Sequence, residues 1–259
     1  MSRNILLILL SIIFATLILN QWMTQLSNVQ YKTNTTLINS NINNDNKKQM
    51  TWDQMIQTYL SFPLDQHYGS HSIVLLAAIF VCQTGPMLEL GMGSSSTPLM
   101  SRISREQKRI LVSVDSDLRW INYFSSLSLN NSFHKMKYVE VNTEMGVEWG
   151  MIQLDNIENW SIILLDHRPG PRRQFDLMIY SYRGDLVILH DTEKSSMYKY
   201  DEGLKYYPYH YRFTRLKTYT DVLSSRNASA VTAVRQLLES IPDNIFGNQT
   251  SKEILKSTS

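Results

Sequence analysis

The chain has 259 residues, of which 43% are hydrophobic and 19% charged, so it can build one full-sized core and global disorder is excluded. Lys and Arg number 25 against 23 Asp and Glu, and this near balance gives no support for a nucleic-acid partner. The single cysteine, Cys82, excludes internal disulfides and zinc sites built on several thiolates.

The chain begins with an apolar run without charges, residues 5–19, preceded by Arg3. A bilayer span takes about 20 residues, and the run can lengthen to Met23 through Trp22. No small-residue cleavage motif follows, so we expect an uncleaved signal anchor, that is, an N-terminal membrane anchor helix, over residues 1–23. A cleaved signal peptide is the alternative. The positive end stays cytosolic, which predicts a single-pass membrane protein whose domain faces the lumen of the secretory pathway or the exterior, or a secreted protein after cleavage.

Residues 24–50 are polar and rich in asparagine, which predicts a disordered stalk. We expect a globular domain over residues 51–240 and a loose tail over residues 241–259. Five Asn-x-Ser/Thr sequons are compatible with a secretory route and a glycoprotein: Asn34, Asn130, Asn159, Asn227 and Asn248.

Within the domain, residues 52–60 carry apolar side chains at helical spacing, and residues 72–82 predict a buried helix too short to span a membrane. Five short apolar runs then predict strands, each ending in a polar residue: 86–90, 109–114, 137–141, 160–165 and 185–189. The gaps between them are long enough for helices. This alternation predicts an α/β fold with a Rossmann-like, doubly wound, mostly parallel sheet. Residues 211–219 alternate and predict a late antiparallel strand, and residues 228–238 a terminal helix.

The first predicted strand ends in the motif Glu89-Leu-Gly-Met-Gly-Ser-Ser, with glycines at 91 and 93. Glycines at a strand end let backbone approach a ligand, and the next helix offers its N-terminal amides. Asp115 stands 22 residues after Gly93, at the end of the next predicted strand, which suits hydrogen bonds to ribose hydroxyls. A dinucleotide-binding motif would have a third glycine where Ser96 stands.

With its acid two residues before the first glycine, this stretch resembles the first motif of class I S-adenosylmethionine-dependent methyltransferases, with Ser95 in place of that family's third glycine. The resemblance covers roughly residues 70–195. It implies S-adenosylmethionine as the cofactor, bound by Glu89, Gly91, Gly93 and Ser95 on the loop and by Asp115 at the ribose.

A second constellation, Asp166-His167 and His190-Asp191, follows the fourth and fifth predicted strands. These residues should meet at the carboxyl edge of the sheet, where carboxylates and an imidazole can bind a divalent cation or perform acid–base chemistry. The arrangement looks like the metal-dependent branch of the family, the catechol O-methyltransferase and cephalosporin hydroxylase relatives. It implies that Asp166 and Asp191 hold Mg²⁺.

The expected function is therefore methyl transfer to a hydroxyl of a small-molecule or glycan substrate. The expected catalytic residues are Asp166, His167, His190 and Asp191. Either His167 or His190 removes the proton of the substrate hydroxyl, or a bound cation lowers the pKa of that hydroxyl. Two alternatives stay open. Asp115-Ser-Asp117 is an Asp-x-Asp element of the kind that membrane-anchored luminal glycosyltransferases use to hold a metal and a nucleotide sugar. The other alternative is a catalytically inactive domain that keeps the fold.

Overall fold

The computed structural model describes residues 50–60, 70–154 and 156–246. The predicted anchor, the stalk up to residue 49 and residues 247–259 of the predicted tail lie outside this part. No helix among the described residues is both long and apolar enough to cross a bilayer. The α-helices are α2 (Trp52–Tyr59), α3 (Ser70–Val81), α4 (Ser96–Gln107), α5 (Leu118–Ser126), α6 (Arg173–Tyr180), α7 (Ser195–Tyr198), α8 (Tyr200–Leu204) and α9 (Ala228–Glu239). The 3-10 helices are η1 (Val147–Met151), η2 (Gly170–Arg172), η3 (Thr192–Lys194) and η4 (Asp243–Phe246).

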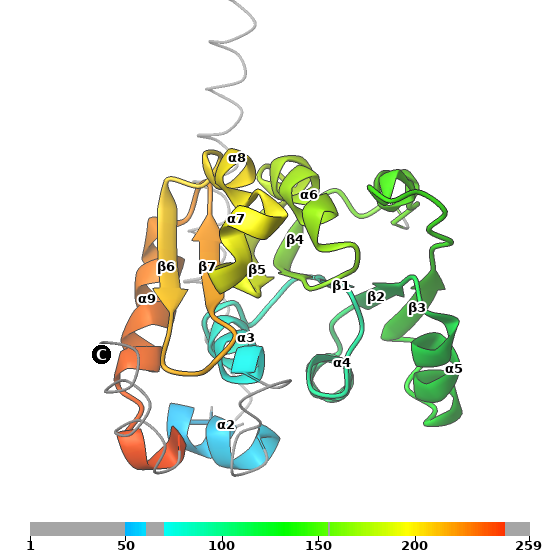
Figure 1. Ribbon diagram of the computed structural model, residues 1–259. Helices are drawn as coiled ribbons and strands as arrows, with labels where there is room; N and C mark the ends of the chain where they lie inside the picture. Colours follow the sequence, from blue (N-terminus) through cyan, green and yellow to red (C-terminus); the bar gives the residue numbers. More distant parts are fainter. Residues whose placement is uncertain (1–49, 61–69, 155, 247–259) are drawn as a thin grey trace, which may run out of the picture. The chain divides into compact units, whose positions relative to one another are not determined.

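The described strands form one sheet in the order β3-β2-β1-β4-β5-β7-β6 (Figure 1). The strands are β1 (Met87–Leu90), β2 (Leu111–Asp115), β3 (His134–Tyr138), β4 (Trp160–Leu165), β5 (Gly184–His190), β6 (Tyr209–Phe213) and β7 (Thr220–Ser224). β1 to β5 are parallel, β7 is antiparallel to β5, and β6 is antiparallel to β7. The predicted doubly wound, mostly parallel sheet with a late antiparallel strand is confirmed. Because the strand order reverses between β1 and β4, a crevice is expected outside their carboxyl ends.

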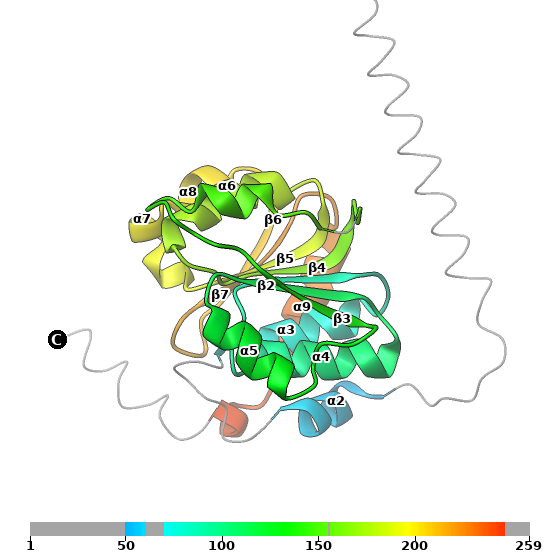
Figure 2. The same cartoon turned by 90° about the vertical axis from the view of Figure 1, so that its right-hand side faces the viewer.

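The helices cover both faces of the sheet (Figure 2). α3, α4, α5 and α9 lie on one face, and α6, α7 and α8 lie on the other. Successive residues of a strand point to opposite faces of the sheet. Met87 and Leu111 pack under the first group of helices, and Leu88 and Val112 pack under the second. Burial on both faces explains why β1, β2, β4 and β5 appear in the sequence as mostly apolar runs.

The two helices predicted before the first strand are confirmed as α2 and α3. α2 starts with a capping box, in which the Thr51 side chain accepts from the Gln54 amide and Gln54 Oε1 accepts from the Thr51 amide. Residues 70–79 of α3 are all buried, because this helix packs against the sheet and against α2, α4 and α9.

β3 spans residues 134–138, earlier than the predicted 137–141. The register explains the difference: His134 pairs with Leu111 and Tyr138 with Asp115, which is the last residue of β2. Among the described strands, none pairs with the chain beyond residue 139.

The alternating run at 211–219 is not a single strand but the end of β6, a turn and the approach to β7. Arg215 donates to the carbonyls of Leu238 and Ile241, which ties the turn to the end of α9. The chain also stays packed beyond residue 240, since Ile241 and Phe246 belong to the core.

Candidate functional site

The loop after β1 places its glycines at the point where the strand order reverses. Gly91 has a φ of +95°, and a Cβ there would lie 2.4 Å from the carbonyl carbon of Asp166, the residue that follows β4. Only glycine avoids this clash. A Cβ on Gly93 would meet only Ser96 Oγ, at 3.5 Å, so the space beside Gly93 is open. The glycine loop and Asp166 are therefore in contact at the expected crevice.

Glu89 lies beneath this loop and is fully buried. Its two carboxylate oxygens accept hydrogen bonds from the hydroxyls of Thr97, at 2.9 Å, and Ser113, at 2.5 Å. Burial raises the pKa of Glu89 to about 7, although the hydroxyl hydrogen bonds oppose that rise. With both oxygens committed to protein groups, Glu89 braces β1 against β2 and α4.

Asp115, at the end of β2, holds the loop from the other side. Its Oδ2 accepts from the Met92 amide at 2.6 Å and its Oδ1 from the Asp117 amide at 2.7 Å. The side chain is almost buried, which raises the pKa of Asp115 to about 6 against the lowering effect of those two amides. Each carboxylate oxygen keeps a further lone pair for a ligand hydroxyl.

Ser95 is the residue that precedes α4, and its side chain makes no capping hydrogen bond. The Gly93 amide donates to Thr97 Oγ1 at 3.0 Å, and the Thr97 amide donates to the Gly93 carbonyl. The first turn of α4 therefore draws the loop backbone toward the helix and leaves its start without a side-chain cap.

Arg173 stands between the two acids that the sequence predicts as metal ligands. Its guanidinium lies 3.0 Å from Asp166 Oδ1 and 3.6 Å from Asp191 Oδ2. It also donates to the carbonyls of His167 and His190, so it ties the end of β4 to the end of β5. Burial would raise the pKa of Asp166, but Arg173 and His190 outweigh burial and lower it well below its usual value.

Asp191 contacts a second cation besides Arg173. It has a φ of +61°, and its Oδ1 accepts from Lys194 Nζ at 3.1 Å. The predicted pair of magnesium ligands is therefore bridged by a guanidinium, and the Asp166–Asp191 pair does not fit Mg²⁺.

His167 is directed into the domain. Its Nε2 lies 2.8 Å from Asp176 Oδ2, and its ring stacks on Trp149 with centroids 4.2 Å apart. The side chain has no exposed surface, and burial lowers its pKa against the opposing effect of Asp176. Of the two histidines predicted as bases, His190 therefore remains beside Asp166, and His167 serves packing.

A residue absent from the sequence prediction completes the group at the crevice. Ligand atoms of His71, Asp166 and His190 all lie within 4.8 Å of one another, and this is the one such cluster among the described residues. His71 comes from α3, and its ring centroid is 4.4 Å from that of His190. Burial lowers the pKa of His71 to about 4, with a further lowering by His190. A lone histidine in an apolar helix carries no sequence signal that could have identified it.

Ser70, His190 and Asp166 also follow one another in the order of a Ser-His-Asp triad. Ser70 Oγ is 3.1 Å from His190 Nε2, and His190 Nδ1 is 3.2 Å from Asp166 Oδ1. Ser70, however, has no exposed surface and donates to the Thr218 carbonyl at 3.0 Å. A buried hydroxyl with its proton committed elsewhere is not a nucleophile, so this chain of contacts positions His190.

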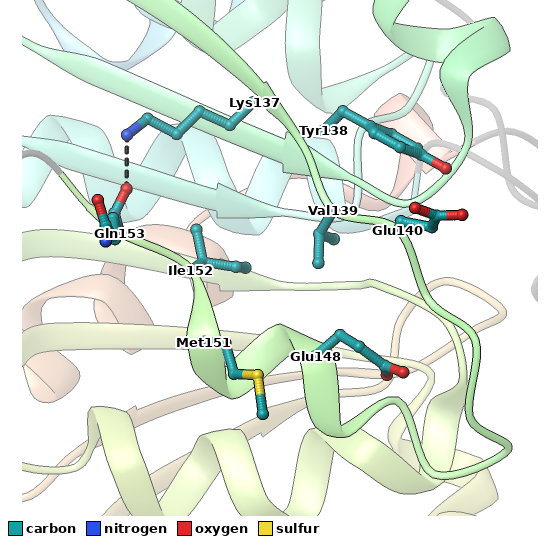
Figure 3. A pocket seen from close by; sticks show the side chains of 8 residues that line it. All are labelled: Lys137, Tyr138, Val139, Glu140, Glu148, Met151, Ile152 and Gln153. Atoms are coloured by element: carbon teal, nitrogen blue, oxygen red, sulfur yellow. Dashed lines mark hydrogen bonds between the residues drawn. The ribbon is translucent and has the colours of Figure 1, made fainter.

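A cavity of about 560 Å³ lies between residues 137–140, at the end of β3, and residues 148–153, which include η1 and the segment after it (Figure 3). Lys137 and Gln153 are joined across it by a hydrogen bond from Nζ to the Gln153 carbonyl. A second cavity, of about 740 Å³, shares Lys137, Ile152 and Gln153 with the first. No predicted site residue lines either of these two cavities.

No protein-family model matches the sequence, and no curated protein matches it. Solved structures do resemble the fold. Human methyltransferase-like protein 13 in complex with SAH is 14% identical, with a TM-score of 0.45 over 75% of this chain and 100% of that one. The O-methyltransferase TomG from Streptomyces achromogenes in complex with SAM is 11% identical, with a TM-score of 0.46 over 73% of this chain and 95% of that one. The N-terminal domain of human METTL16 in complex with SAH is 14% identical, with a TM-score of 0.42 over 59% of this chain and 70% of that one.

Two of these structures are named as methyltransferases, the class that the loop motif resembles. With identities and TM-scores this low, the functional proposal for this chain has to come from its own residues.

Proposed function

We propose that this protein is an S-adenosylmethionine-dependent methyltransferase that modifies a hydroxyl group of a small-molecule substrate. The observation that carries the proposal is the contact between the glycine loop and Asp166 where the strand order reverses. In open α/β sheets this point is where ligands bind. A cofactor bound over Gly93 and Asp115 would lie beside the acid–base groups at the ends of β4 and β5.

The residues present fit the cofactor. Asp115 keeps lone pairs for ribose hydroxyls while its hydrogen bonds to two backbone amides hold it in place. Gly93 leaves open space beside the loop, where the cofactor can approach the backbone. When bound, S-adenosylmethionine supplies the electrophilic methyl group.

Asp166 and His190 would handle the substrate hydroxyl. Asp166 stays ionised, because its pKa is lowered, and its side chain is 23% exposed, so it can accept a hydrogen bond from the hydroxyl. His190 Nδ1, 3.2 Å from Asp166 Oδ1, is placed to take the proton. Arg173 keeps the two strand ends at a fixed separation, and such positioning contributes much of the rate in methyl transfer.

Calorimetric titration of the full chain with S-adenosylmethionine tests the proposal. We expect saturable binding that Asp115→Ala weakens at least tenfold, because the ribose loses its acceptor. The matched control is Asp117→Ala, two residues away. Asp117 caps α5 and pairs with Arg119, so its loss should cost stability and leave cofactor affinity unchanged. Absence of binding at millimolar cofactor, in a chain that unfolds cooperatively, would overturn the proposal in favour of an inactive domain.

The same titration separates the glycosyltransferase alternative. In the structure the two carboxylates that would share a metal ion have separate partners. Asp115 Oδ1 accepts from the Asp117 amide, and the Asp117 carboxylate pairs with Arg119. Binding of a nucleotide sugar with Mn²⁺ that depends equally on both acids would favour that alternative.

A further inference from the structure

We propose that His71, Asp166 and His190 form a binding site for a divalent transition metal of the Zn²⁺ class. The three side chains come from α3 and from the ends of β4 and β5, and their ligand atoms lie within 4.8 Å of one another. The contact between His190 Nδ1 and Asp166 Oδ1, at 3.2 Å, is about the spacing of two ligands that share one metal ion.

His71 is the first independent sign of a missing partner. Its side chain is only 3% exposed, and neither ring nitrogen has a hydrogen-bond partner. A buried polar group without a partner costs free energy, and such groups are rare in folded proteins. A metal ion bound to one nitrogen of His71 would remove the part of this cost that belongs to that nitrogen.

The hydrogen bonds around His190 give the second sign. The Ser70 and Thr218 hydroxyls lie 2.5 Å apart, so one donates to the other, and they lie 3.1 and 3.0 Å from His190 Nε2. In the tautomer in which Nε2 donates to these hydroxyls, Nδ1 keeps a lone pair for a metal ion.

That lone pair lies next to a carboxylate. His190 Nδ1 is 3.2 Å from Asp166 Oδ1 but makes no hydrogen bond in this geometry. Asp166 Oδ1 also pairs with Arg173 at 3.0 Å, and a metal ion bound to Oδ1 and Nδ1 would occupy the side that faces His71. The outer hydrogen bond at Nε2 is the kind that orients a metal-binding histidine.

The donor set also determines which metals suit the site. Two imidazoles and one carboxylate favour Zn²⁺, Fe²⁺ or Co²⁺, whereas Mg²⁺ prefers oxygen ligands. Arg173 already bridges the two acids that a magnesium site would need. Three protein ligands leave at least one coordination position for a substrate oxygen, and a metal there would lower the pKa of the substrate hydroxyl in place of a proton transfer to His190.

The test uses the full chain in mild detergent, stripped of metal with a chelator and titrated with CoCl2. We expect one visible absorption band that saturates at one Co²⁺ per chain, is abolished by ZnCl2 and is unaffected by millimolar MgCl2. His71→Ala and His190→Ala should each weaken Co²⁺ binding at least tenfold. The control is His210→Gln, on β6 outside the cluster, which should bind as tightly as the unmodified chain.

A second measurement does not depend on folding of the variants. X-ray absorption of the Zn²⁺-loaded, unmodified chain should show scattering from two imidazole ligands. Binding at other stoichiometry, binding unchanged by both histidine variants, or a spectrum without two imidazoles would each overturn the proposal. Because no readout includes S-adenosylmethionine, this result is independent of the proposed methyl transfer.

Discussion

Gly91 and Gly93 are equivalent in the sequence motif but have different physical roles. Gly91 adopts a positive φ against the backbone of Asp166, whereas Gly93 faces open space. Gly91→Ala should destabilise the domain by about 3 kcal/mol or more, because the added Cβ meets backbone atoms that cannot move aside. Gly93→Ala should leave the free energy of unfolding nearly unchanged and weaken cofactor binding. Urea unfolding and calorimetry of both variants measure these effects, and equal losses of stability would contradict this assignment.

Glu89 should make the stability of the domain depend on pH. Its ordinary pKa of 4.5 rises to about 7 in the folded protein, so the folded state holds this proton more tightly than the unfolded state. The stability it contributes is present below pH 4.5 and is lost as the pH rises through 7. The difference corresponds to on the order of 3 kcal/mol.

Glu89→Gln keeps the shape of the side chain and removes the charge. We expect it to match the unmodified chain near pH 5 and to be the more stable protein at pH 8. Denaturant unfolding at a series of pH values gives this difference directly. A difference that stays constant over the range would show that Glu89 is ionised in both states.

The sequence predicted part of this site well. Asp166 and His190 meet because strand ends in a parallel sheet share an edge, which strand prediction alone can establish. Arg173 and His71 could not be predicted, because their positions depend on how α6 and α3 pack on the sheet. The roles of Glu89 and Asp115 as braces of the loop follow from burial, which the motif does not reveal.

At the scale of elements, Asp221 fastens the hairpin to the parallel sheet. This carboxylate on β7 has no exposed surface and accepts from Arg212, His210 and Thr192. Asp221→Asn should destabilise the domain by about 2 kcal/mol, because the buried carboxylate loses the charge that strengthens its hydrogen bonds from Arg212 and His210.

Asp185→Asn is the matched control for this prediction. Asp185 pairs with Arg226 at 2.8 Å, but both side chains are more than 40% exposed. Such surface pairs contribute less than about 1 kcal/mol. The midpoints of urea unfolding compare the two variants, and a loss for Asp185→Asn as large as that for Asp221→Asn would show that burial does not decide the effect.

The hairpin also shows why element boundaries were harder to predict than element types. β1, β2, β4 and β5 are mostly apolar, since both of their faces are covered, and their positions were predicted closely. β3 and β6 are edge strands with polar residues, so their ends follow the register of a neighbour more than their own sequence. The turn between β6 and β7 carries an alternating pattern that local reasoning cannot distinguish from a strand.

At the scale of the whole molecule, we propose that the domain enters the secretory pathway behind the apolar N-terminal run. Three of the five sequons lie in the described part of the chain. The Asn130 and Asn159 side chains are exposed, whereas Asn227 is half-buried and its Oδ1 accepts from the Ala230 amide as the cap of α9. A glycan on Asn227 would compete with this cap, so we expect glycans on Asn130 and Asn159 in preference to Asn227.

Translation of the full chain with sealed microsomes tests this placement. Glycosidase treatment should increase gel mobility, and Asn130→Gln and Asn159→Gln should each remove one step of that shift. Asn227→Gln is the control and should change the shift least. The domain should also resist protease added outside the vesicles. Unshifted chains that such protease digests would place the domain on the cytosolic side, because glycan transfer and protection both require passage into the lumen.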